Sequence, residues 1–107
     1  MIRFLRKPLP LLVSQADVVT DAPERYAKQL VSHLGRKVTV EETPEGQVLL
    51  IGGGRGLVAP GDGVLVLRAE AKGSEALATV QGVLGRHLER FGSKAELVIT
   101  WSEPRPV

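Results

Sequence analysis

Three turn sequences follow one another closely in the middle of the chain, and they limit the possible folds more than any other feature. They are Thr43–Gly46, Gly52–Gly54 and Pro60–Gly63, where proline and glycine favour chain reversal. The segments next to these turns are rich in valine and leucine, which predicts strands at Gln47–Ile51, Leu57–Ala59 and Val64–Ala69. Strands joined by such short turns pair antiparallel with their neighbours. The middle of the chain is therefore predicted to form an antiparallel meander.

Two helices and three further strands flank this meander in the prediction. Valine-rich or alternating segments predict strands at Leu11–Val19, Lys37–Glu42 and Glu96–Trp101. The first helix is expected to begin after an Asp21 N-cap and to end at a left-handed Gly35. The second is expected to begin at Ser74 and to end at Gly92. The order β-α-β-β-β-β-α-β predicts an α+β fold, a single curved, mostly antiparallel sheet with both helices on one face.

A chain of 107 residues with 43% hydrophobic and 24% charged side chains fits one globular domain. We expect a mobile leader over residues 1–10, the domain over residues 11–102 and a loose tail over residues 103–107. The strands Val48–Ile51 and Val64–Leu67 are apolar on both sides, yet two helices cover only one face of a sheet. The second face then needs a cover, which could be a second copy of the chain, the leader or an apolar ligand. A homodimer is the preferred prediction.

Charge and composition exclude several classes of protein. The net charge is only +2, from 14 basic and 12 acidic side chains, without a Lys/Arg block, so nucleic-acid binding is not expected. The chain has no cysteine, which removes disulfides, thiolate nucleophiles and cysteine metal ligands and fits a reducing cytoplasm. Prolines 8 and 10 interrupt the apolar start, which argues against a signal peptide, and no apolar segment has the length of a membrane span. The expected location is the cytoplasm.

The candidate ligand-binding residues lie in the two predicted helices and at the end of the last strand. Helical spacing places Tyr26, Gln29 and His33 together on a flank of the first helix, either as a ligand-contacting strip or as an ordinary boundary. His87 lies within the apolar stripe of the second helix and is expected to point towards the sheet, as a core histidine or as a general acid or base. The full set of candidates is Tyr26, Gln29, His33, His87, Arg90 and Trp101.

No metal site or cofactor is predicted. If the helices run in opposite directions along the strands, His33 and His87 lie at opposite ends of the helical layer, about 15 to 20 Å apart. The same assumption brings His87 and Arg90 towards the start of the first helix, near Glu24 and Tyr26, and predicts a polar pocket there. The glycines of Gly52–Gly56 lack the spacing of a phosphate-binding loop and predict a hairpin turn. Catalytic residues stay unassigned, because the sequence shows neither a nucleophile elbow nor a suitable carboxylate pair.

Three ordered segments resemble a family of small bacterial domains of unknown function. The resemblance covers about residues 15–101 and is carried by Thr20–Lys37, Val64–Ala71 and His87–Trp101. Its recognition marks fall on Arg25, Tyr26, Lys28, Gln29, His33, His87, Glu89, Arg90, Phe91 and Trp101. Members of this family are sometimes joined to, or encoded near, siderophore-interacting flavin-binding reductases. The chain departs from the family pattern at Ala59–Gly63, where members have more acidic character.

Three functions follow from these residues and from the resemblance. The first is a cytosolic accessory or binding protein, which holds a small ligand or a partner in the iron-siderophore context that the resemblance implies. The second is a small enzyme in which His87 is the general acid or base, and this requires a solvent-open cleft at His87. The third is a structural partner of a reductase without a ligand pocket, which requires a large exposed apolar face on the sheet.

Overall fold

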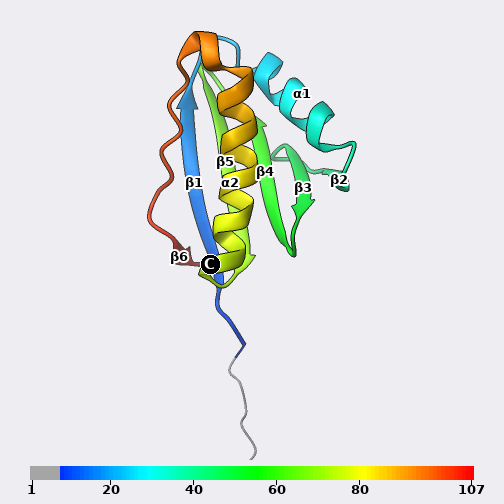
Figure 1. Cartoon of the computed structure of the whole chain (residues 1–107), viewed down its shortest axis with the longest axis vertical. Coiled ribbons are helices and arrows are strands. Elements are labelled where there is room, and N and C mark those ends of the chain that lie inside the picture. Colours follow the sequence, from blue (N-terminus) through cyan, green and yellow to red (C-terminus); the bar gives the residue numbers. More distant parts are fainter. Residues whose placement is uncertain (1–7) are drawn as a thin grey trace, which may run out of the picture.

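The computed structural model describes residues 8–107, and within this range six strands form one antiparallel sheet beside two α-helices (Figure 1). The elements are β1 (Leu11–Val19), α1 (Pro23–Leu34), β2 (Val40–Glu42), β3 (Gln47–Ile51), β4 (Gly54–Pro60), β5 (Val64–Lys72), α2 (Ser74–Phe91), the 3₁₀ helix η1 (Ser93–Ala95) and β6 (Arg105–Pro106). The strand order across the sheet is β2-β3-β4-β5-β1-β6. The predicted α+β fold is confirmed.

The meander from β2 to β5 forms where the turn sequences predict it. The Thr43 hydroxyl donates to the Gly46 carbonyl at 2.7 Å and so closes the first turn. Gly52 and Gly53 turn the chain between β3 and β4 with φ values of 48° and 80°, a left-handed region that favours glycine. The hairpin predicted at Gly52–Gly56 is therefore confirmed, and β4 begins within it, at Gly54.

The helix termini agree only in part with the prediction. Ala22, not Asp21, is the N-cap of α1, and the Thr20 hydroxyl accepts a hydrogen bond from the Ala22 amide at 3.1 Å. Gly35 ends α1 with a right-handed φ of −62°, so the expected left-handed cap is wrong. The second helix begins at Ser74 and ends before Gly92, as predicted.

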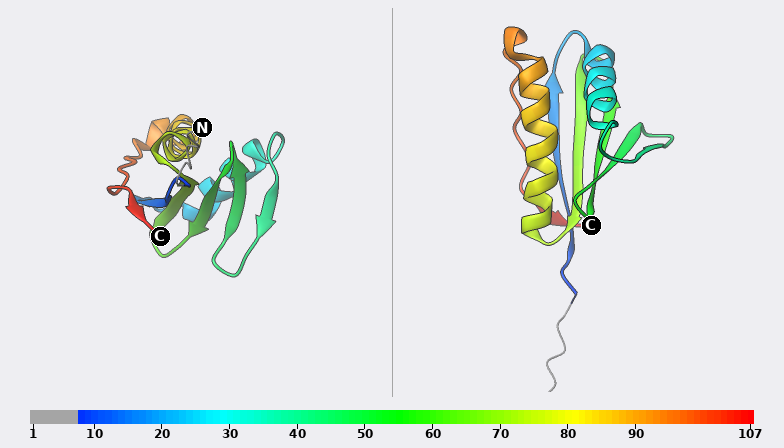
Figure 2. Two further views of the ribbon diagram at one scale, coloured as in Figure 1. Left: turned by 90° about the horizontal axis from the view of Figure 1, so that it is seen from below. Right: turned by 45° about the vertical axis from the view of Figure 1, so that its right-hand side comes forward.

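The C-terminal segment differs most from the prediction. Residues 96–101 do not form the predicted strand, because Glu96 has a φ of 52° after η1 and the chain then extends alongside α2 and the outer edge of β1 (Figure 2). The tail was expected to be loose, yet the Ser102 amide donates to the Gln15 carbonyl at 2.8 Å and the Val107 amide to the Leu11 carbonyl at 3.0 Å. The tail thus covers the edge that β1 would otherwise expose, because β6 pairs with Leu12 and Val13.

The hydrophobic core lies between the sheet and the two helices, which share one face of it, as predicted (Figures 1 and 2). Its fully buried members come from both layers. The largest of them are Leu30 of α1, Leu77, Val80, Leu84 and Leu88 of α2, and Val18, Leu49, Val58, Leu65 and Leu67 of the sheet. Neither helix within residues 8–107 has the length and apolar character that crossing a membrane requires.

The second face of the sheet is covered in part by polar side chains of the same chain. Leu57 is opposite Arg68 in the register, while its neighbour Val58 is opposite the core residue Leu67, so Leu57 points away from the helices. Leu57 and its partner Val48 are nevertheless only 6% exposed. Arg68 extends across this face and pairs with Glu45 at 3.1 Å. Long side chains therefore explain part of the two-sided apolar pattern within one chain.

Residues 8–10 are the described part of the leader that could cover this face. Phe4 and Leu5 lie outside the described residues, and Leu9 is 63% exposed. The chain just before β1 is attached to the domain by the Pro10 carbonyl, which accepts from the Gly73 amide at 2.9 Å. The homodimer stays a prediction.

Candidate functional site

His33 and His87 meet where the last turn of α1 contacts α2. Their ring centroids are 5.2 Å apart, with the ring planes inclined at 44°. The predicted separation of about 15 to 20 Å for helices aligned with the strands is therefore wrong. Figure 1 shows α1 set obliquely to α2 and beside its C-terminal half. The C-terminal turn of α1 thus reaches the C-terminal half of α2.

Phe91 completes this contact. Its ring meets the His33 ring edge-on, with centroids 5.4 Å apart and planes inclined at 79°. Phe91 follows His87 by one helical turn, so both rings lie on the same side of α2. We call His33, His87 and Phe91 the histidine corner. The sequence analysis did not include Phe91 among the candidates, although its four-residue spacing from His87 could have indicated the contact.

The imidazole of His87 is held by its own helix. Its Nδ1 atom lies 2.7 Å from the Val83 carbonyl oxygen, and because a carbonyl only accepts, Nδ1 carries the proton and donates it. In the neutral ring Nε2 then keeps its lone pair. His87 is half-buried and its ring contacts His33, so the expectation that it points towards the sheet is wrong.

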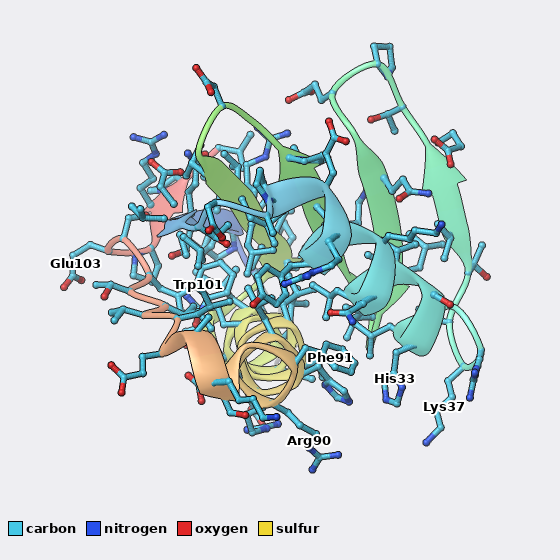
Figure 3. All side chains as sticks on the ribbon, turned by 90° about the horizontal axis from the view of Figure 1, so that it is seen from above. His33, Lys37, Arg90, Phe91, Trp101 and Glu103 are labelled. Atoms are coloured by element: carbon cyan, nitrogen blue, oxygen red, sulfur yellow. The ribbon has the colours of Figure 1, made fainter. Side chains whose placement is uncertain are left out.

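Basic side chains lie on the same side of the molecule as the corner. His33, Lys37 and Arg90 are exposed, and Figure 3 shows them projecting on the same side of the molecule as Phe91. Both helices also end here, and the negative end of a helix dipole favours a bound cation. The corner therefore combines lone-pair donors, cations and an aromatic edge. Within residues 8–107 no group of three or more His, Asp or Glu side chains is placed to share a metal ion.

The other candidates lie elsewhere. Tyr26 is only 6% exposed and packs in the core, with the Arg25 guanidinium 5.3 Å from its ring centroid. Gln29 is exposed, so Tyr26, Gln29 and His33 do not form one surface strip. The pocket predicted for His87 and Arg90 near the start of α1 is also wrong, because His87 contacts the end of that helix.

Trp101 lies on the opposite flank of α2 from Phe91 (Figure 3). It lines a shallow hollow with Ile99, Gly85 and Arg86. A methyl group on Gly85 would lie 3.6 Å from the Trp101 Nε1 atom, which is an ordinary contact distance. Trp101 is therefore a packing residue at the edge of α2 and does not belong to the histidine corner.

The sequence did not predict the cavity formed where the C-terminal tail meets β1 and β5. This cavity has a volume of about 490 Å³, and its polar lining includes Gln15, Arg68, Glu70, Ser102 and Arg105. It depends on the pairing of the tail with β1, and a tail that is expected to be loose cannot form a wall. No local pattern in the sequence connects these residues.

The chain matches the family described as uncharacterized proteins conserved in bacteria (DUF2218) over residues 15–102. It belongs to this family. Among solved structures it is similar to the NMR structure of PA4090 from Pseudomonas aeruginosa, with 27% sequence identity and a TM-score of 0.70. That similarity covers 85% of this chain and 95% of the other. No curated protein matches the chain.

Proposed function

We propose that this DUF2218 chain is an accessory binding protein that holds a small anionic ligand at the histidine corner. The observation that carries the proposal is the contact between two imidazoles from different helices, 5.2 Å apart, with Phe91 edge-on to one of them. Two rings from distant parts of the sequence meet here at the surface. A ligand can reach this contact because His33 is exposed and His87 only half-buried.

The surroundings favour an anion with an aromatic part. Lys37 and Arg90 supply positive charge on the side of the molecule where the rings lie, and a planar guanidinium recognises carboxylates and similar oxyanions with two hydrogen bonds. The Phe91 edge and the imidazole faces supply contacts for a flat ring. A metal-catecholate siderophore complex is anionic and aromatic, so this chemistry agrees with the iron-siderophore context of the resemblance.

A titration with gallium catecholate, a diamagnetic substitute for the ferric complex, tests the proposal by calorimetry and by NMR of the imidazole rings. We expect the ring signals of His33 and His87 to shift. Removal of one exposed charge in Arg90→Ala should weaken binding about threefold. Arg86→Ala removes the same charge from the same helix but beside Trp101, and it should change the affinity much less. Unshifted histidine signals at saturating ligand, or equal effects of both arginine variants, would refute the proposal.

A catalytic role for His87 is the second candidate. The bond from Nδ1 to the Val83 carbonyl orients the ring and leaves Nε2 able to take a proton. Within the described residues the polar contact of this ring is to a backbone carbonyl, which orients the imidazole but does not relay a proton. The same titration separates the two functions, because a bound ligand is recovered unchanged and a substrate is not.

The third candidate, a purely structural partner of a reductase, requires a large apolar face. The open face of the sheet instead carries Arg55, Arg68 and Glu70 from adjacent strands. These charges interrupt the apolar surface and favour the first candidate over the third.

A further inference from the structure

We propose that His33 and His87 are two ligands of a divalent first-row transition metal ion such as zinc, nickel or copper. This inference rests on the proposed function, because it assigns a ligand class to the same corner. Neutral imidazole nitrogen is a preferred ligand of these ions. Two observations carry the inference, the separation of the rings and the hydrogen bond of His87.

The separation of the ring centroids is compatible with an ion that both ligating nitrogens face. A zinc ion about 2.05 Å from each ligating nitrogen lies about 3.2 Å from each ring centroid, and two such centroids at a tetrahedral angle are about 5.2 Å apart. The centroids of His33 and His87 are 5.2 Å apart. The helices therefore already hold the two rings at the spacing of the bound state. Little of the chain has to move when the ion binds.

The hydrogen bond of His87 prepares its other nitrogen for a metal. Histidines that ligate metals usually donate their second ring N–H to a carbonyl or carboxylate, which fixes the tautomer and the direction of the ring. His87 makes this bond through Nδ1 to the Val83 carbonyl at 2.7 Å. Nε2 is then the nitrogen that keeps its lone pair and can ligate a metal. His33 is exposed, so an ion in solution can reach its ring.

The protein supplies two ligands, and the remaining positions of the ion stay open to other donors. Within residues 8–107 no third His, Asp or Glu joins the pair. Water or the oxygen atoms of a chelating ligand can occupy these positions. The ion therefore connects the imidazole pair to an anionic ligand that Arg90 and Lys37 attract.

Isothermal titration of the full, tag-free chain with zinc chloride, together with ¹⁵N NMR of the imidazole rings, tests this inference. We expect one ion per chain and large shifts of the Nε2 signal of His87 and of one ring nitrogen of His33. His33→Ala and His87→Ala should each weaken zinc binding at least about tenfold, because the loss of a second-shell partner alone costs that much. Ser32→Ala, an exposed neighbour on α1, should leave the affinity unchanged.

Arg90→Ala separates the metal from the anion. Removal of this positive charge should leave zinc binding equal or slightly stronger, whereas it should weaken the catecholate complex. His33 is exposed, so His33→Ala keeps the test valid even if His87→Ala unfolds the chain. Zinc binding that survives the loss of both histidines, or unshifted ring signals, overturns the inference. If gallium catecholate still binds in that case, the proposed function stands. If neither zinc nor gallium catecholate binds at the corner, the inference and the proposed function both fail.

Discussion

Gly54 is the position where a single added carbon should test the packing of the fold most directly. It is buried at the start of β4, and a Cβ atom there would lie 2.7 Å from a methyl carbon of Val80 in α2. The same atom would lie 2.8 Å from the Glu70 carbonyl oxygen and 2.9 Å from the Ala71 Cβ atom, both in β5. Backbone atoms of a paired strand cannot move aside as a side chain can. Gly54→Ala must therefore shift α2 away from the sheet or disturb the pairing of β4 with β5.

The expected cost is about 2 kcal/mol. Overpacking of a well-packed core costs about 1 to 3 kcal/mol, and the contact with backbone places this site at the upper end of that range. Alanine returns about 0.5 to 1 kcal/mol, because it loses less conformational freedom than glycine on folding. A loss of about 2 kcal/mol should lower the Tm of a domain of this size by about 10 °C.

Gly85→Ala is the matched control, since it adds the same methyl group at another buried glycine of the same core. Its Cβ would lie 3.6 Å from Trp101 Nε1 and 3.8 Å from Ile99 Cγ2, both ordinary distances. Replacement of a glycine inside a helix by alanine is worth about 1 kcal/mol, so the Tm should rise by about 5 °C. Thermal and urea unfolding followed by circular dichroism measure both changes. A Gly54→Ala protein within about 2 °C of the unmodified chain, or a Gly85→Ala protein that is less stable, would contradict the packing argument.

Two further predictions concern the tail and the assembly. Ser14→Ala removes the hydroxyl that donates to the Ser102 carbonyl, which should lower the free energy of unfolding by about 1 to 2 kcal/mol. Hydrogen exchange at the Ser102 and Val107 amides should become faster. Unchanged exchange would show that the tail is held without this bond. The homodimer predicted from the two-sided apolar strands should appear at twice the chain mass in native mass spectrometry. A monomer across the micromolar range would contradict it and would leave the cover of Val48 and Leu57 to Arg68 and its neighbours.

Residues next to one another in the sequence determined most of the secondary structure. Val and Leu runs between Gly and Pro turns placed β1 and β3 at their observed bounds, because strand propensity and turn formation depend on a few neighbouring residues. The end of α2 at Gly92 follows from the same local chemistry. The antiparallel pairing of β2 to β5 also follows, since short turns leave the chain no other partner nearby.

Long-range packing decided the parts that the sequence did not predict. Residues 96–101 have the valine and isoleucine of a strand, yet they run beside α2, and it is the end of the tail that pairs with the free edge of β1. An unpaired strand edge exposes backbone N–H and C=O groups that can pair with another segment. Only the assembled sheet shows which segment can reach this edge. Local sequence patterns carry no information about which segment reaches that edge.

The candidate site shows the same division between sequence and tertiary structure. The sequence by itself determined that two histidines lie on helices, each near the helix end. Only the tertiary structure decided that they touch, because the contact depends on the oblique packing of α1 against α2 and on the length of each helix (Figure 1). Helix crossing is set by the fit of side-chain ridges across the whole interface, and no single helix encodes it. The pair 5.2 Å apart is therefore a property of the folded core and not of either helix.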